Sequence, residues 1–305
     1  MAASTIVVLG SEEDEHAATM LAYLRQTGHD AELLDSRWFP TQLTLWRNPM
    51  VGEGEMGLPS GRRLSLAQIR SVYWRTYNGV SVPPLGDDEE TYIAHNDARS
   101  LFEALLIDLP TRWVNGWEAY QLHQTKPVAL ARVAALGVPI PPTVWSNEPA
   151  QVRAFARQHK QVIFKPVQGG DETRRLTEAH LSDENLASLQ LAPVTLQAEV
   201  AGTNIRVFVA GQRVLACEVR TPELDYRQDL AAELLVHVLP AEIEEQARRI
   251  AACLALVWTG IDYRRTVEGV YVFLEANPSP MFLGFEAQTG LPLTASLASL
   301  LTAER

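Results

Sequence analysis

A short hydrophobic run that ends abruptly on polar residues most restricts how this chain can fold. Residues 270–274 (VYVFL) are apolar and favour a buried β-strand. Glu275 and Asn277 follow directly, and Pro278 stops the strand. Because side chains alternate along a strand, Glu275 and Asn277 share one face. A buried strand therefore delivers a carboxylate and a carboxamide together at its end.

A second strand is expected beside the first, formed by residues 258–266 (WTGIDYRRT) and joined to it by a tight hairpin at 268–269. In this pairing Asp262 lies next to Glu275 and Asn277. Two carboxylates and an amide oxygen this close repel one another unless a cation lies between them. Mg²⁺ prefers such oxygen ligands and also bridges substrate phosphates. The residues therefore indicate a metal site, and a hairpin with exposed acids at its end is the alternative.

A strand lysine followed by two glycines is the second candidate for ligand binding. Residues 162–164 predict a strand that carries Lys165, and Gly169 and Gly170 follow after a proline. An ammonium group and backbone N–H groups exposed at glycines suit a polyphosphate. The order differs from that of a P-loop, in which the lysine follows the glycines. The alternative is an ordinary hairpin with a solvated lysine.

Three more strands are predicted in the region after Pro193. Residues 196–200 form one of them, and residues 205–210 and 213–219 form a hairpin. The edge of the first strand can offer backbone groups to an adenine ring, while Glu199 accepts bonds from ribose hydroxyls. Arg206 can hold a phosphate with two parallel hydrogen bonds. The alternative is an arginine that points outward from a half-exposed strand.

The N-terminal part reads as an α/β unit. A strand at 5–10, a helix with an acidic first turn and a strand at 31–35 open the chain. Residues 71–77 (SVYWRTY) form another strand with Arg75 near its end, and a helix is predicted over 87–109. Changes of pattern divide the chain into three predicted domains: residues 1–112, 113–194 and 195–305.

The composition is that of a soluble globular protein, with 47% hydrophobic and 21% charged residues. A net charge of −11 without a basic patch argues against a nucleic-acid partner. No apolar run approaches the ~20 residues that span a bilayer, so no membrane partner is expected. The N-terminus lacks the basic flank of a signal peptide, and two cysteines without metal-ligand spacing suit a reducing compartment. A cytoplasmic location is the prediction.

In chain order, these residues resemble the ATP-grasp superfamily of carboxylate–amine ligases. The shared features are a lysine that opens a helix, a strand lysine before a glycine loop, a Gln-x-Glu hinge, an Ile-Arg strand, an aspartate and a Glu-x-Asn end: Lys126; Lys165, Gly169 and Gly170; Gln197, Glu199 and Val200; Ile205 and Arg206; Asp262; Glu275 and Asn277. The resemblance covers about residues 113–305. It implies an α/β (α+β) fold with two subdomains that grasp the nucleotide and a Rossmann-like pre-ATP-grasp domain before them.

The resemblance also implies ATP and Mg²⁺ as cofactors. In the family, the two lysines bind the phosphates, the hinge holds adenine, and the aspartate, glutamate and asparagine hold two magnesium ions. A carboxylate is activated as an acylphosphate, which an amine or hydroxyl then attacks. We expect Arg206 to hold the transferred phosphate and the tetrahedral oxyanion. Arg227 and Arg75 are weaker candidates for substrate contact.

Within the superfamily, the chain is most similar to ribosomal-peptide maturases of the microviridin or graspetide type. The carriers of this narrower match are residues 71–77, 112–143, 224–227 and 273–293. It implies a precursor peptide as substrate, with Asp or Glu side chains linked to Ser, Thr or Lys, and a homodimer as in many relatives. Asn204 stands where relatives commonly have Asp, and the strand at 71–77 has one arginine where relatives often have two.

Other functions remain open at this point. A ligase that joins small molecules such as amino acids, or one like the ribosomal-protein glutamate ligase, would use the same nucleotide machinery. A nucleotide-binding regulatory module without catalysis is disfavoured, because both lysines and all three metal ligands are present. The carboxylate donor, the nucleophile and the choice between ester and amide are not specified by the sequence.

Overall fold

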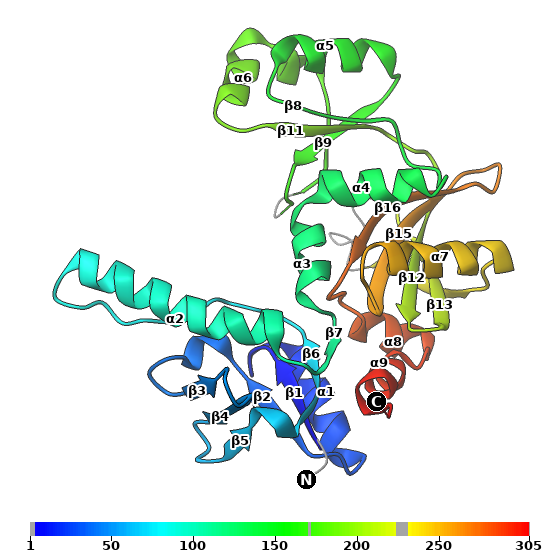
Figure 1. Ribbon diagram of the computed structural model, residues 1–305. Coiled ribbons are helices and arrows are strands. Elements are labelled where there is room, and N and C mark those ends of the chain that lie inside the picture. Colours follow the sequence, from blue (N-terminus) through cyan, green and yellow to red (C-terminus); the bar gives the residue numbers. More distant parts are fainter. Residues whose placement is uncertain (1–3, 170–171, 224–230, 305) are drawn as a thin grey trace.

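The protein is represented by a computed structural model that describes residues 4–169, 172–223 and 231–304. The N-terminal part contains a parallel sheet in the order β2-β1-β6-β7 and a separate, small antiparallel sheet in the order β3-β4-β5 (Figure 1). The elements of this part are β1 (Thr5–Leu9), α1 (Glu15–Gln26), β2 (Ala31–Leu34), β3 (Thr44–Asn48), β4 (Glu53–Gly57), β5 (Arg63–Ser65), β6 (Ile69–Trp74), α2 (Asp88–Asp108) and β7 (Arg112–Val114).

Both faces of the parallel sheet are covered, which explains why β1 is buried at every position. Val7 and Leu9 pack with Phe102 of α2 on one face. Ile6 and Val8 pack on the opposite face with a core that includes α1. The predicted βαβ opening is therefore confirmed.

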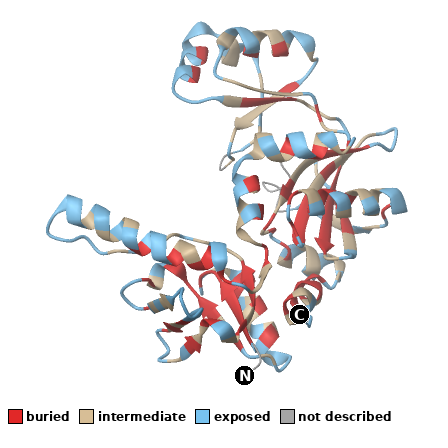
Figure 2. Ribbon diagram, viewed as in Figure 1, coloured by how far each residue is buried: buried red, intermediate tan, exposed pale blue. Residues whose placement is uncertain are grey.

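The middle of the chain forms a separate antiparallel sheet in the order β10-β9-β11-β8, at the top of Figure 1. Its core is small, because six buried side chains form it within the described part of the chain: Val152, Phe155, Val162, Leu186, Leu189 and Leu196. Figure 2 shows that buried residues are concentrated in the other two large sheets. The elements here are β8 (Thr143–Ser146), α5 (Pro149–Gln158), β9 (Val162–Pro166), β10 (Arg174–Arg175), α6 (Asp183–Ala187) and β11 (Val194–Ala198).

The C-terminal part is built on a five-stranded antiparallel sheet in the order β14-β13-β12-β15-β16. One face packs against α4 and α7 around Val207, Ile250 and Tyr263. The elements are β12 (Thr203–Ala210), β13 (Arg213–Arg220), β14 (Glu233–His237), α7 (Ala241–Cys253), β15 (Trp258–Arg265), β16 (Tyr271–Asn277), α8 (Leu283–Thr289) and α9 (Leu293–Thr302), with α3 (Trp117–Gln124) and α4 (Lys126–Ala135) leading in from the N-terminal part.

A shared hydrophobic core joins the N-terminal and C-terminal sheets. Met20 of α1 belongs to the same buried cluster as Phe208 of β12, Trp258 of β15 and Leu297 of α9. Figure 1 shows α8 and α9 lying beside the N-terminal sheet. These two sheets therefore form one packed body, although the chain between them is long.

Most predicted elements are present with small shifts. Lys126 opens a helix as predicted, and a separate helix, α3, ends at Gln124 just before it. The strand predicted at 196–200 is displaced to 194–198, so Glu199 lies just after it. Both predicted hairpins are confirmed, with β12 paired to β13 and β15 paired to β16. Among the described residues, no helix combines the length and apolar character that crossing a membrane requires.

Candidate nucleotide and metal site

Three oxygen-bearing side chains meet on the hairpin of β15 and β16. Asp262 lies directly opposite Glu275, and Asn277 lies opposite Gly260. The register shifts between Asp262 and Tyr263, which is the signature of a bulge. Side chains directly opposite each other in an antiparallel pair are about 5 Å apart at Cβ. The hairpin therefore brings Asp262 and Glu275 together, as its sequence spacing predicted.

A cation accompanies each of the two carboxylates. Nζ of Lys126 donates to Oε2 of Glu275 at 2.9 Å, and Nη1 of Arg206 donates to Oδ2 of Asp262 at 2.8 Å. Burial alone would raise the pKa of Glu275, but the ammonium groups of Lys126 and Lys165 hold that pKa well below its usual range. Glu275 is therefore ionised at neutral pH.

The Arg206 guanidinium has a close fit against the neighbouring strand. Arg206 is only 5% exposed, and its guanidinium carbon lies 5.4 Å from the ring centre of Phe208. A Cβ placed on Gly260 would come within 2.4 Å of Arg206 Nη2. The missing side chain at Gly260 therefore makes the space in which the guanidinium reaches Asp262.

The side-chain oxygens of Asp262, Glu275 and Asn277 fit a divalent ion that is also bound by a substrate. Within the described part of the chain, no group of three or more His, Cys, Asp and Glu side chains could hold a metal ion by itself. Asp262 and Glu275 supply two carboxylates, and Asn277 supplies an amide oxygen. Mg²⁺ is usually bound by one or two carboxylates together with substrate phosphates and water. The side chains therefore suit Mg²⁺ that arrives with a nucleotide.

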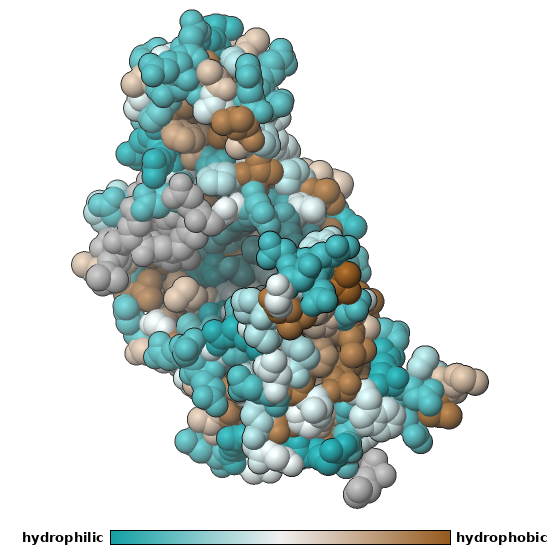
Figure 3. Space-filling model, turned by 90° about the vertical axis from the view of Figure 1, so that its left-hand side faces the viewer, coloured by the Kyte–Doolittle hydropathy of each residue, from teal (hydrophilic) through white to brown (hydrophobic). Residues whose placement is uncertain are grey.

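A cavity beside the hairpin contains both lysines of the sequence prediction. Lys126 comes from the first turn of α4, which packs on the C-terminal sheet, and Lys165 comes from β9 of the middle sheet. The lining residues that carry polar or aromatic side chains are His123, Lys126, Trp145, Lys165, Thr195, Gln197, Phe273 and Glu275. Figure 3 shows that the molecule is hollowed at mid-height on the face it presents. The ammonium groups of Lys126 and Lys165, which line the same cavity, suit a polyphosphate.

The glycine loop after β9 lies against Lys126. Gly169 has φ +105°, and a Cβ there would lie 3.2 Å from Lys126 Nζ. A glycine is needed at this position both for the backbone conformation and for the close approach. Gly170, the second glycine of the predicted loop, lies outside the described residues.

The predicted adenine hinge follows β11. Gln197 is buried, and its Nε2 donates to Thr143 Oγ1 at 3.1 Å. Arg175 donates to both oxygens of Glu199, from Nε at 2.9 Å and from Nη2 at 2.8 Å. These bonds lower the pKa of Glu199. Val200 is half-buried beside them, and the roles of Gln197, Glu199 and Val200 in adenine and ribose binding stay predictions.

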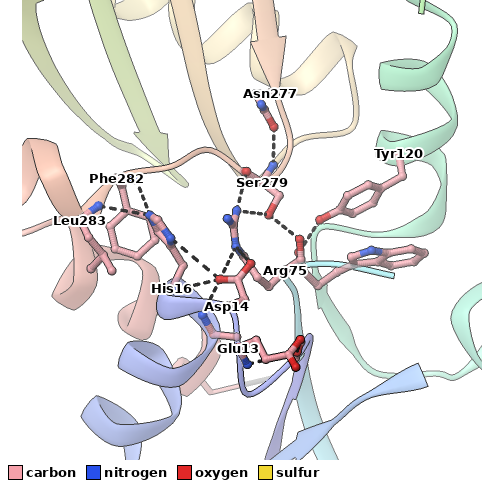
Figure 4. Close-up of polar contacts among 12 residues, drawn as sticks. Glu13, Asp14, His16, Arg75, Tyr120, Asn277, Ser279, Phe282 and Leu283 are labelled. Atoms are coloured by element: carbon pink, nitrogen blue, oxygen red, sulfur yellow. Dashed lines mark hydrogen bonds and ion pairs between the residues drawn. The ribbon is translucent and has the colours of Figure 1, made fainter. Parts of the chain in front are cut away.

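Arg75 lies in a polar cluster between the N-terminal sheet and the segment after β16 (Figure 4). Its Nε donates to Asp14 Oδ2 at 2.9 Å, and its Nη1 donates to the backbone oxygen of Ser279 at 2.7 Å. Its role in substrate contact stays a prediction. Arg227, the other candidate for substrate contact, lies outside the described residues.

Several residues at the site carried no signal in the sequence. His123 and Trp145 line the cavity, whereas their sequence context predicts only hydrogen bonding or packing. Burial lowers the pKa of His123, and the nearby Lys126 lowers it further. Arg175 is one of several scattered arginine doublets, and only its pairing with Glu199 distinguishes it.

Comparison with known proteins identifies the class to which this fold and site belong. Residues 134–301 match the family described as RimK-like ATP-grasp domain. A solved structure of the ATP-grasp ligase PsnB is 30% identical over 99% of this chain and 100% of that one, with a TM-score of 0.84. The chain belongs to the RimK-like ATP-grasp family, as the resemblance in its sequence predicted.

Further comparisons agree on the fold. The macrocyclase MdnC from Microcystis aeruginosa MRC has a TM-score of 0.86 at 21% identity, covering 98% of this chain and 100% of that one. A "Probable alpha-L-glutamate ligase" from Nitrosococcus oceani is 36% identical over 96 residues, or 30% of this chain. That match spans about a third of the curated relative's length, 31%. The solved PsnB complex contains a minimal precursor variant, Mg and ADP.

Proposed function

We propose that the protein is an ATP-dependent ligase that activates a carboxylate as an acylphosphate and joins it to an amine or hydroxyl of a ribosomally made precursor peptide. The strongest support in the structure is the pair Asp262 and Glu275, which lie opposite each other. Each of them forms an ion pair with a basic side chain, Arg206 and Lys126 respectively. A second lysine, Lys165, lines the cavity beside them. This arrangement suits a triphosphate and its metal more than any uncharged ligand.

In the proposed reaction, a substrate carboxylate attacks the γ-phosphorus of ATP, which forms the acylphosphate and breaks the bond to the β-phosphate, so that ADP leaves. Lys126 and Lys165 neutralise phosphate oxygens and orient the chain of phosphates. Mg²⁺ held by Asp262, Glu275 and Asn277 would spread the charge that develops on the transferred phosphoryl group.

Arg206 has a separate part in the proposed reaction. Its guanidinium donates to Asp262 and occupies the space that a side chain at Gly260 would fill. It therefore presents a preorganised cation to the transferred phosphate and then to the tetrahedral oxyanion. The acylphosphate finally loses phosphate when the nucleophile attacks.

The peptide substrate is supported by the relatives that cover the whole chain. PsnB was solved with a minimal precursor, and MdnC with the precursor peptide MdnA. Each matches at least 98% of this chain, so the similarity includes the N-terminal part as well as the ATP-grasp part. A cytoplasmic location and a homodimer stay predictions, and light scattering of the purified protein tests the latter.

The direct test is mass spectrometry of a short peptide encoded beside the gene, after incubation with protein, ATP and Mg²⁺. Each ester or amide formed within the peptide removes one molecule of water and releases one ADP. A peptide of unchanged mass, together with ADP release that does not depend on the peptide, would contradict the proposal.

A glutamate ligase is the second candidate, because the match to the Nitrosococcus oceani relative favours it. Such an enzyme adds free glutamate to an acceptor, so the acceptor gains mass. Supplying glutamate in the same assay separates the two: cross-linking leaves the glutamate unused, whereas glutamate addition consumes it.

A further inference from the structure

The segment between β16 and α8 starts directly after a predicted metal ligand, Asn277, and contacts the N-terminal part of the chain. Asn277 ends β16, and Leu283 begins α8. Between these residues, His16 of α1 and Arg75, which directly follows β6, contact the segment at two points (Figure 4). Both contacts join residues more than 200 positions apart.

The first contact is made by Arg75. Its Nη1 donates to the backbone oxygen of Ser279 at 2.7 Å and to Ser279 Oγ at 2.9 Å. Ser279 Oγ donates in return to the backbone oxygen of Arg75 at 2.7 Å. The other side of the guanidinium is fixed by Asp14, whose carboxylate also caps the N-terminus of α1. Arg75 is only 10% exposed, so these bonds are shielded from water.

The second contact is made by His16. Its Nε2 accepts from the backbone N–H of Phe282 at 2.9 Å. The ring also lies edge-on to Phe282 at a centroid distance of 4.9 Å. His16 thus holds the far end of the same segment, where α8 begins.

Ser279 passes this constraint to Asn277. The backbone N–H of Ser279 donates to Asn277 Oδ1 at 2.9 Å. A carbonyl oxygen has two lone pairs, so this bond fixes the orientation of the amide and leaves a second lone pair for a cation. Partners that orient a ligand in this way commonly change metal affinity when they are removed.

We propose that Arg75 is a positioning residue for the metal ligand Asn277, acting through Ser279, so that the N-terminal domain completes the magnesium site. This inference rests on the proposed function, and it gives Arg75 a role that differs from the substrate contact predicted from the sequence. Asp14 keeps the guanidinium in place, and His16 anchors the opposite end of the segment.

The test measures Mg²⁺-dependent binding of a fluorescent ADP analogue to the full-length protein. Arg75→Met with Asp14→Asn removes the ion pair without leaving a buried charge, and Asn keeps an acceptor for the cap of α1. Arg70→Met is the matched control, because Arg70 lies near the start of β6, whereas Arg75 directly follows its end, and Arg70 donates to the backbone oxygen of Thr302. Arg75→Lys is added as the conservative variant.

We expect the double variant to need about 10- to 100-fold more Mg²⁺ for half-maximal nucleotide binding, with Arg75→Lys in between. Binding of the analogue in EDTA and the Mg²⁺ dependence of Arg70→Met should match the wild type. An unchanged Mg²⁺ requirement in the double variant overturns the inference, and so does an equal change in Arg70→Met. If the wild type itself binds no Mg²⁺–nucleotide complex, the proposed function is wrong and this inference is lost with it.

Discussion

Gly260 shows how a single missing side chain can set the geometry of a charged site. The three atoms nearest to a Cβ placed on it all belong to the guanidinium of Arg206, at 2.4 to 2.7 Å. Real Cβ atoms do not come this close, so any larger residue must displace the guanidinium. Arg206 is buried on this face and donates to Asp262, so its displacement changes the charge balance of the site.

Gly260→Ala is therefore expected to reduce ATP turnover by about tenfold or more, the effect of losing one preorganised charge donor. The glycine does not have a positive φ, so the alanine backbone itself is not strained. ADP release measured with the precursor peptide checks this prediction.

Gly284→Ala is a suitable control, because no atom lies within 4 Å of a Cβ at Gly284. Full activity in Gly260→Ala would mean that the position of Arg206 does not matter for the reaction.

At the scale of elements, the sequence pattern predicted the features that depend on residues close together in the chain. The spacing from Asp262 to Glu275 fixed the hairpin and hence their opposition across β15 and β16. The glycine after Lys165 and the start of a helix at Lys126 are also local signals. The meeting of these elements in one cavity came from the family resemblance, because no periodicity encodes which sheets pack together.

The contacts of His16 and Arg75 with the segment before α8 could not be predicted from the sequence. Asp14 reads as an ordinary helix cap, and Ser279 as a residue between two prolines. Their partners are distant in sequence, and the interaction exists only because α8 and α9 pack beside the N-terminal sheet.

His16 gives this junction an expected pH dependence. Burial lowers the pKa of His16 to about 4, and the charge of Arg75 adds to the effect. The unfolded chain has a His pKa near 6.5, so it takes up a proton before the folded state does. The contribution of neutral His16 to the free energy of unfolding is therefore fully present above pH 6.5, and it is lost progressively as the pH falls toward 4.

We expect the free energy of unfolding to fall by at most about 1.4 kcal/mol per pH unit from this group over that range. His16→Gln keeps an acceptor for Phe282 but does not titrate, so it should show a shallower acid slope in urea unfolding followed at several pH values. An identical slope in the variant would show that His16 is not the group responsible.

At the scale of the whole molecule, the four hydrophobic cores formed by the described residues do not coincide with the three domains predicted from the sequence. The core around Met20, Phe208 and Trp258 spans the predicted boundary at residue 112. The middle sheet, by contrast, has a small core of its own. Residue 112 begins β7, which pairs with β6, and residue 194 begins β11, which pairs with β9. The predicted boundaries remain predictions as limits of independent folding.

A fragment of residues 1–112 is accordingly expected to be unfolded in isolation. It lacks α9, whose Leu293, Leu297 and Leu301 are fully buried in the shared core. Burying a leucine side chain contributes about 2 kcal/mol, so three such losses exceed what a small domain can spare.

Far-UV circular dichroism and thermal unfolding of the fragment check this expectation. A cooperative transition in the fragment, at a temperature close to that of the whole protein, would show that the N-terminal sheet folds by itself.

The central claim is that Glu275 helps to hold the metal and triphosphate, and ADP release by Glu275→Ala tests it most directly. Glu268→Ala is the control, since Glu268 lies at the exposed turn of the same hairpin. Loss of Mg²⁺-dependent ADP release in Glu275→Ala, with an unchanged melting transition and full activity in Glu268→Ala, is the predicted result. Normal ADP release by a folded Glu275→Ala protein would contradict the account.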